Sequence, residues 1–156
     1  MDKTAEIWSR STGAEFLRAM SEGKVPVPPH AAFVGLAVRA VGEGRIEMAW
    51  SPGEPLRNPG GMVHGGYIAM VLDDTAALSC STLADRYRPM LTLYLHLDFI
   101  RPVVACETYA LIGEVAHAGA ARLVADARIV SAAGKLHARA TGSFLPNQAF
   151  DPTRPA

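Results

Sequence analysis

The chain has 156 residues, a length typical of one domain that buries its own core. Apolar residues make up 49% of it and charged residues 19%, and this apolar excess indicates burial against further copies of the chain. Lysine plus arginine equals aspartate plus glutamate at 15 each, so no net charge attracts nucleic acid or an anionic membrane. We therefore expect an oligomer that binds neither of these partners.

The N-terminal segment lacks the apolar core of a signal peptide, and no apolar run approaches the roughly 20 residues of a membrane span. Cys80 and Cys106 fall in different predicted elements and show no metal-binding spacing, so we expect two reduced, buried thiols. Together these features predict a soluble, cytoplasmic protein.

The first predicted elements are a helix and a hairpin. Apolar residues recur at helical spacing from Ile7 to Met20, and Gly23 with the proline-rich segment VPVPPH ends this helix. A linker follows. Residues 33–41 and 45–50 alternate between apolar and other side chains around a Gly-Glu-Gly turn, which predicts a β-hairpin.

The second half of the chain predicts one buried helix and a sheet. After a loop rich in glycine and proline at 51–61, residues 63–83 form a helix with almost no polar stripe, which must be covered on most sides. Short turns separate four further predicted strands, at 91–101, 106–116, 122–131 and 136–145. This order favours an α+β fold in which an antiparallel sheet curves around one long apolar helix.

The predicted organisation is one domain with additions at both ends. An N-terminal helix and linker occupy residues 1–30, and the main domain covers 31–147. The tail at 148–156 is rich in proline and polar residues and is expected to be flexible.

The start of the apolar helix, within NPGGMVHGGYIAMVLDD at 58–74, combines glycines with unpaired backbone donors. Glycine costs roughly 1 kcal/mol against alanine in a helix, so Gly65 and Gly66 indicate a need for bare backbone. The first turn of a helix carries free N–H groups that can reach a carbonyl oxygen or an oxyanion. The alternative is that the two glycines only allow tight packing on a strand.

Asp73 is a carboxylate inside an otherwise apolar helix, where an unpaired charge costs several kcal/mol. It follows Gly65 by eight residues, or roughly 12 Å along the axis, so one substrate carbonyl cannot touch both groups of one chain. A site that uses both needs two antiparallel helices and therefore a twofold dimer. Asp74 points about 100° away, and we interpret it as a solvated or ion-paired residue at the helix rim.

These residues resemble a known family. An N-x-x-G-x-x-H-G-G motif followed by an acid nine residues after the histidine resembles the hotdog-fold acyl-CoA thioesterases of the phenylacetic-acid-pathway and 4-hydroxybenzoyl-CoA type. The strand ending HLDFIRPV is similar to the corresponding strand of that family, and the resemblance covers about Phe33 to Leu145. The residues that carry the motif are Asn58, Gly61, His64, Gly65, Gly66 and Asp73.

The resemblance implies a role for each matching residue. The backbone amide of Gly65 would polarise the thioester carbonyl, and the neighbouring Gly66 would help to bind the substrate. His64 and Asn58 would shape that loop or hold the nucleophilic water. Asp73 would be the general base, or the nucleophile of a transient anhydride. Thr92, at the start of the next strand, would help to hold the water. For His64, the alternative is that its ring only caps the turn.

Coenzyme A would need cations for its phosphates, and Arg101, Arg122 and Lys135 are the candidates, with ordinary surface charge as the alternative. Coenzyme A would be part of the substrate, and no separate cofactor is expected. The histidines show no metal-ligand spacing, so no metal site is predicted. Strict alternation places Thr92 with Tyr94, His96 and Asp98 on one strand face, interpreted as a polar face at a subunit interface.

The function predicted from these features is hydrolysis of an acyl-CoA or aryl-CoA thioester by a homodimer or a dimer of dimers. One alternative is a hotdog module or sensor that binds acyl-CoA without cleaving it. Another is a dehydratase, although His64 and Asp73 match its histidine and carboxylate pair only loosely.

Overall fold

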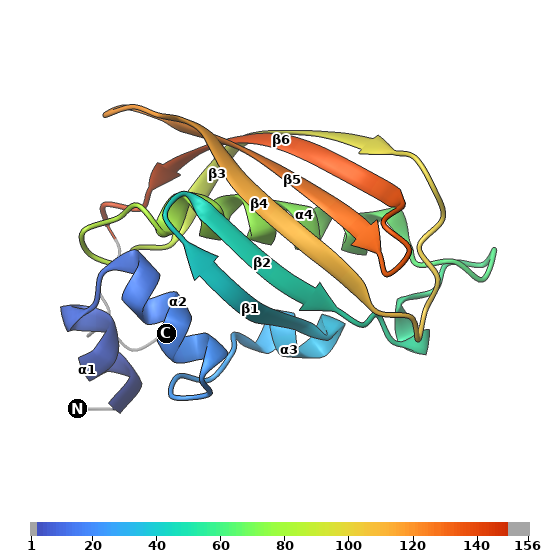
Figure 1. Ribbon diagram of the computed structural model, residues 1–156, viewed down its shortest axis with the longest axis horizontal. Helices are drawn as coiled ribbons and strands as arrows, with labels where there is room; N and C mark the ends of the chain where they lie inside the picture. The colour runs from blue at the N-terminus through green and yellow to red at the C-terminus, as the bar shows by residue number, and fades with distance from the viewer. Residues whose placement is uncertain (1–2, 150–156) are drawn as a thin grey trace.

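The computed structural model describes residues 3–149, with side chains from residue 6 onward. The elements are α1 Lys3–Arg10, α2 Gly13–Ser21, α3 Pro29–Val34, β1 Leu36–Gly42, β2 Arg45–Trp50, the single-turn helix η1 Glu54–Leu56, α4 Gly65–Ser81, β3 Met90–Phe99, β4 Tyr109–Ala118, β5 Leu123–Ser131 and β6 Leu136–Pro146. Six strands form one antiparallel sheet that curves around the long central helix, with α1 and α2 at one end and α3 beside β1 (Figure 1). The strand order is β1-β2-β4-β5-β6-β3. The α+β hotdog fold predicted from the sequence is confirmed.

The core lies between α4 and the concave face of the sheet. Val71, Leu72 and Ala76 of α4 are fully buried, and Trp50 and Phe144 are buried on the sheet side. Burying an apolar side chain of this size contributes roughly 1.5–3 kcal/mol, so the helix is held mainly by packing. In the described residues, no helix has both the length and the hydropathy needed to cross a membrane.

The N-terminal helix predicted over 7–20 is two helices. The break lies at Thr12, whose hydroxyl accepts the amide of Glu15 while the Glu15 carboxylate accepts the amide of Thr12. This reciprocal capping box starts a new helix. The apolar spacing continues across the break because Trp8 and Phe16 face the same aromatic cluster, with ring centroids 5.0 Å apart. Periodicity alone therefore did not reveal the boundary.

Helix α2 docks directly on the end of α4. A side chain on Gly13 would lie 1.6 Å from the carbonyl oxygen of Ser81, so only glycine permits this approach. The amide of Gly13 donates to the carbonyl of Ala84 at 2.8 Å. Through this contact Leu17 and Met20 of α2 join the main hydrophobic core.

The sequence predicted a linker followed by a strand that begins at residue 33. This prediction is wrong for residues 29–34, which form α3. Pro28 and Pro29 stand at the start of α3, where their missing amides are not needed. Gly35 ends it in the left-handed region with φ 78°. Strand β1 therefore begins only at Leu36, while Phe33 remains exposed on α3.

The other predicted strands and the apolar helix agree with the structure within three residues at each end. Cys80 is buried as expected, and burial raises its pKa to about 12. The prediction for Cys106 is wrong, because it lies exposed in the turn before β4 with φ 65° and its thiol contacts the Glu54 carboxylate at 3.4 Å. Residues 150–156 of the predicted tail lie outside the described residues.

Candidate active site

The first turn of α4 has one free amide, and it belongs to Gly65. The ring Nδ1 of His64, the N-cap residue, accepts the amide of Gly66 at 2.9 Å. The amide of Tyr67 donates to the carbonyl of His64 at 3.0 Å. Among residues 3–149, no acceptor contacts the amide of Gly65. His64 thus caps the helix, and the cap leaves the Gly65 donor available.

The two glycines have different reasons to be small. A Cβ on Gly65 would meet only the ring of Phe99, at an ordinary contact distance of 3.5 Å. Tight packing within the chain therefore does not explain Gly65, which favours approach by a ligand. A Cβ on Gly66 would lie 3.1 Å from Nδ1 of His64, so Gly66 makes room for the cap.

Asn58 shapes the loop that leads to α4. Its side-chain oxygen accepts the amides of Gly60 at 2.9 Å and Met62 at 3.3 Å. Asn58, Gly65 and Arg101 line one open pocket of about 320 Å³, together with Phe99 and neighbouring residues. Three of the predicted site residues thus surround the free end of α4.

Asp73 and Thr92 are brought together by α4 and β3. The Thr92 hydroxyl donates to one carboxylate oxygen of Asp73 at 2.9 Å and lies 3.1 Å from the other. Burial raises the pKa of the Asp73 carboxyl above its usual range, and the hydrogen bond from Thr92 offsets part of this rise. The result is an oriented carboxylate that is more basic than a solvated one.

A β-bulge between Thr92 and Tyr94 decides which side of β3 faces α4. Before the bulge, Thr92 contacts Asp73 on α4. After it, Leu95 and Leu97 pack against the core while Tyr94 is exposed. The alternation that places Thr92 on the face of Tyr94 is therefore wrong, because the inserted residue reverses the phase of the strand.

Asp74 faces away from Asp73 and pairs with His30 of α3. Its Oδ2 lies 3.1 Å from Nε2 of His30, and the two side chains are 26% and 51% exposed. Burial raises the pKa of Asp74, the His30 charge lowers it, and the Asp73 charge raises it. This contact corresponds to the paired, rim-type residue expected from the sequence.

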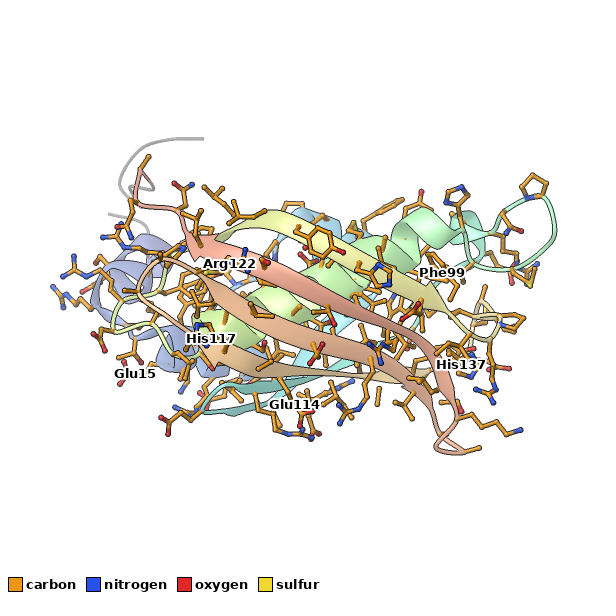
Figure 2. All side chains as sticks on the ribbon, turned by 90° about the horizontal axis from the view of Figure 1, so that it is seen from above. Glu15, Phe99, Glu114, His117, Arg122 and His137 are labelled. Carbon is orange, nitrogen blue, oxygen red and sulfur yellow. The ribbon has the colours of Figure 1, made fainter. Side chains whose placement is uncertain are left out.

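The two predicted arginines lie at opposite ends of the sheet, Arg101 near Gly65 and Arg122 at the other end (Figure 2). Arg101 follows β3 and donates from Nη1 to the carbonyl of Leu136 at 2.6 Å. Arg122 precedes β5 at the end of the sheet opposite Phe99 (Figure 2). One chain therefore holds two partial sites, one around Gly65 and one around Asp73, separated along α4 by roughly 12 Å.

Strand β3 is an edge strand that exposes several large apolar side chains beside the polar His96 and Asp98. Among residues 3–149 it pairs only with β6, at the margin of the sheet. Four of its large side chains are between 45% and 58% exposed, namely Leu91, Leu93, Tyr94 and Phe99. A long apolar edge of this kind is a template for pairing with another chain. Within the described residues, no cluster of three His, Cys, Asp or Glu side chains could hold a metal ion.

Comparison with protein families shows which family this chain belongs to. The thioesterase superfamily matches residues 60–138, which is more than half of the chain. The chain belongs to the thioesterase superfamily. The range that matches the superfamily contains the predicted site residues Gly65, Asp73, Thr92, Arg101 and Arg122. Asn58 lies two residues before this range.

Three known proteins are similar to this chain. A Saccharolobus solfataricus protein provisionally named an esterase is 29% identical over 112 residues, covering 72% of this chain and 79% of its own. A phenylacetic acid degradation-related protein of Ralstonia eutropha JMP134, provisionally named a thioesterase, shares 28% identity with a TM-score of 0.74 over 82% of this chain and 97% of that one.

The third is a thioesterase-type protein of Streptococcus pneumoniae TIGR4, whose function is described as hypothetical and whose structure was solved with coenzyme A. It has 20% identity and a TM-score of 0.68, covering 74% of this chain and 90% of its own, which shows that the two share a fold. These likenesses confirm the resemblance predicted from the sequence motif.

Proposed function

We propose that this protein hydrolyses an acyl-CoA or aryl-CoA thioester to the free acid and CoA, in the cytoplasm, at a site shared by the two chains of a twofold homodimer. The observation that carries the proposal is the carboxylate of Asp73, half-buried in an apolar helix and oriented by Thr92. A carboxylate whose pKa is raised by burial is a better base for water than a solvated one.

The amide of Gly65 supplies the second requirement of the reaction, a donor for the oxyanion. It has no acceptor among the described residues and lines an open pocket. One preorganised donor of this kind commonly lowers the barrier by about 3 kcal/mol. Gly65 and Asp73 of one chain are too far apart to serve one carbonyl, so the donor comes from Gly65 of the partner subunit.

The edge strand β3 supports this assembly. Pairing of two β3 strands about a twofold axis satisfies their free backbone groups and covers the apolar side chains of this edge. Because β3 packs beside α4, the same axis sets the two α4 helices side by side in opposite directions. Association of two such dimers into a tetramer is part of the proposal.

In the proposed reaction, the thioester carbonyl accepts a hydrogen bond from Gly65 of the partner subunit. Asp73 takes a proton from water as the water oxygen bonds to the carbonyl carbon, and the C–S bond then breaks to release the CoA thiolate, which is protonated to the thiol. In the second form of the step, the Asp73 carboxylate attacks the carbonyl carbon itself, the C–S bond breaks to release the CoA thiolate, and water then hydrolyses the resulting anhydride to the free acid and the Asp73 carboxylate.

Coenzyme A is the proposed leaving group because the S. pneumoniae relative was crystallised with it. Arg101 lines the pocket around Gly65, and one of its five donors is taken by Leu136, so others can serve a phosphate. Arg122 lies at the Thr92 end of the sheet, because Leu123 and Thr92 both pair with Phe144. In a twofold dimer that end faces the Arg101 end of the partner.

The test combines turnover with binding. Purified protein mixed with a panel of acyl-CoAs and a thiol reagent is expected to release free CoA, and Asp73→Asn is expected to abolish the release while acyl-CoA binding, measured by calorimetry, persists. Unchanged release by Asp73→Asn would remove Asp73 from the mechanism. Tight binding without turnover of any thioester by the wild type would instead establish a non-catalytic acyl-CoA-binding module.

A further inference from the structure

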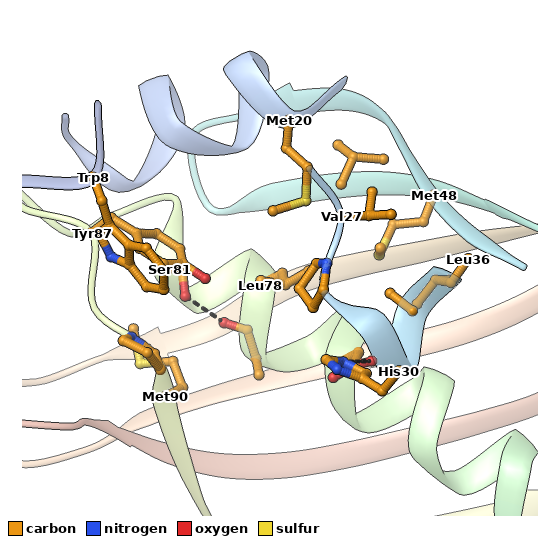
Figure 3. A pocket seen from close by; sticks show the side chains of 16 residues that line it. Trp8, Met20, Val27, His30, Leu36, Met48, Leu78, Ser81, Tyr87 and Met90 are labelled. Carbon is orange, nitrogen blue, oxygen red and sulfur yellow. Dashed lines mark hydrogen bonds and ion pairs between the residues drawn. The ribbon is translucent and has the colours of Figure 1, made fainter. Parts of the chain in front are cut away.

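A second cavity, largely apolar and about 270 Å³ in volume, lies between α4 and the N-terminal part of the chain. Helix α2 covers it from the side opposite α4, and the aromatic rings of Trp8 and Tyr87 close one end (Figure 3). The apolar side chains that form its wall include Trp8, Met20, Val27, Met48, Leu78 and Tyr87.

Asp73 and Thr92 do not line this cavity themselves, but residues one helical turn and two strand positions away from them do. Ala77 lines it and follows Asp73 by four residues, so the two lie one above the other on one face of α4. Met90 lines it as well and precedes Thr92 by two residues, on the same side of β3 ahead of the bulge. A group bound at Asp73 and Thr92 therefore reaches the cavity after one helical turn, about 5.4 Å along α4.

We infer that this cavity is the acyl pocket, and that the substrates are thioesters of a compact apolar acid, such as an arylacyl or medium-chain acyl group. The inference rests on the hydrolase function proposed above and adds the substrate class. The N-terminal segment then sets specificity, because Trp8 on α1 and Met20 on α2 form the closed side of the pocket.

The volume limits the size of the acyl group. An apolar cavity of about 150 Å³ in another protein binds benzene, so about 270 Å³ accommodates a ring with a short linker or a chain of similar bulk. A long fatty chain exceeds this volume, and acetyl leaves most of it empty. Both are therefore poorer substrates.

The side chains that line the cavity disfavour an acyl group that carries a second carboxylate. Of the described side chains that line the cavity, Asp74 and His30 are the ionisable pair at the rim, 3.1 Å apart. The Tyr87 hydroxyl is kept neutral, since burial and the Asp74 charge raise its pKa to about 12. A terminal carboxylate would meet apolar side chains and the Asp74 carboxylate, which already engages His30, so thioesters of dicarboxylic acids are disfavoured.

The test is a substrate profile for two opposing variants. For the wild type, kcat/KM is expected to peak at phenylacetyl-CoA or octanoyl-CoA, and to be lower for acetyl-CoA, palmitoyl-CoA and succinyl-CoA. Ala77→Phe fills the mouth and is expected to lower kcat/KM for the preferred substrates at least about tenfold while sparing acetyl-CoA. Met20→Ala deepens the pocket and is expected to move the optimum to longer chains by a similar factor. Ala132→Phe, in the exposed turn between β5 and β6, is the matched control and should leave the profile unchanged.

Binding separates failure of this inference from failure of the hydrolase function. Titration of Asp73→Asn with the same acyl-CoAs, followed by tryptophan fluorescence, is expected to show a signal that Trp8→Phe removes, because the other tryptophan, Trp50, is fully buried elsewhere. If the wild type hydrolyses thioesters and the substrate profile is unchanged in both Ala77→Phe and Met20→Ala, the acyl pocket is wrong and the hydrolase function stands. If no thioester is hydrolysed, the hydrolase function is wrong. Tighter binding of octanoyl-CoA than of acetyl-CoA, weakened by Ala77→Phe, would in that case still support the acyl pocket. Equal affinities for the two acyl-CoAs would overturn the acyl pocket.

Discussion

Thr92 of β3 donates its hydroxyl hydrogen to the Asp73 carboxylate of α4 at 2.9 Å. The contact joins the edge strand to the central helix at the point where burial has raised the pKa of the acid. A hydroxyl in this position fixes the direction of the carboxylate and limits the rise in its pKa. The Thr92 hydroxyl therefore keeps the carboxylate ionised and oriented, while burial keeps it more basic than a solvated one.

Replacing Thr92 with valine is expected to weaken activity through Asp73. A hydrogen bond to a charged group contributes about 1.5–3 kcal/mol, so kcat should fall roughly ten- to a hundredfold. Loss of the bond also raises the pKa of Asp73 further, which moves the acidic limb of the pH–rate profile to higher pH. Thr92→Ser keeps the hydroxyl and is the matched control. An acidic limb that stays in place in Thr92→Val would separate Thr92 from the titration of Asp73.

Asp73→Asn is expected to make the fold more stable at neutral pH while it removes activity. Because burial raises the pKa of Asp73, the folded chain keeps this proton at pH values where the unfolded chain has lost it. Stability therefore falls as pH rises from the usual aspartate pKa through the raised value, and stays lower above it. Thermal unfolding at several pH values should show a higher Tm for Asp73→Asn at pH 7 and no difference below the unfolded pKa. A lower Tm at pH 7 would mean that groups of the partner stabilise the carboxylate.

Gly65→Ala separates folding from function at the helix start. The added methyl group meets only Phe99 at 3.5 Å, so the free energy of unfolding should be unchanged or rise by up to about 1 kcal/mol. The same methyl group crowds the approach to the amide, and a shift of about 1 Å in substrate position costs roughly a hundredfold in rate. Chemical denaturation and thiol-release kinetics measure the two effects. Full activity in Gly65→Ala would show that no ligand approaches this backbone.

His64→Ala is expected to lower stability by about 1 kcal/mol through loss of the N-cap, and His64→Asn to restore most of it, since asparagine is a strong N-cap residue. Activity should follow stability in this pair, because the imidazole acts by holding the first turn. Urea denaturation gives the stabilities. An asparagine variant that is stable but inactive would assign the imidazole a direct part in the reaction.

The sequence predicted correctly those elements whose hydrophobic pattern allows only one packing arrangement. The apolar run after Gly65 has one stable solution, a helix covered by a sheet, and the short turns between the later strands require antiparallel pairing. The capping box at Thr12 and the left-handed Gly35 are visible as residue types, but the apolar spacing on either side conceals them. These boundaries depend on which backbone groups find partners.

The site was predictable as a set of residues and less so as an arrangement. The Asp73 carboxylate stands out because its helix is apolar, yet its contact with Thr92 depends on a bulge that no residue of β3 signals. The pairing of Asp74 with His30 depends on α3, which the sequence pattern presents as a linker. Contacts between distant segments are set by tertiary packing, and local pattern does not encode them.

The central claim is that each site combines Gly65 of one chain with Asp73 of the other, and mixing two impaired variants tests it most directly. Gly65→Ala and Asp73→Asn chains, coexpressed in equal amounts with different affinity tags, form mixed dimers in which one site carries both changes and the other carries neither. Thiol release from an acyl-CoA by the mixture is the measurement. The account predicts recovery to about a quarter of wild-type activity, since half of the dimers are mixed and each holds one intact site. Activity that stays at the level of the two separate variants would contradict a shared site.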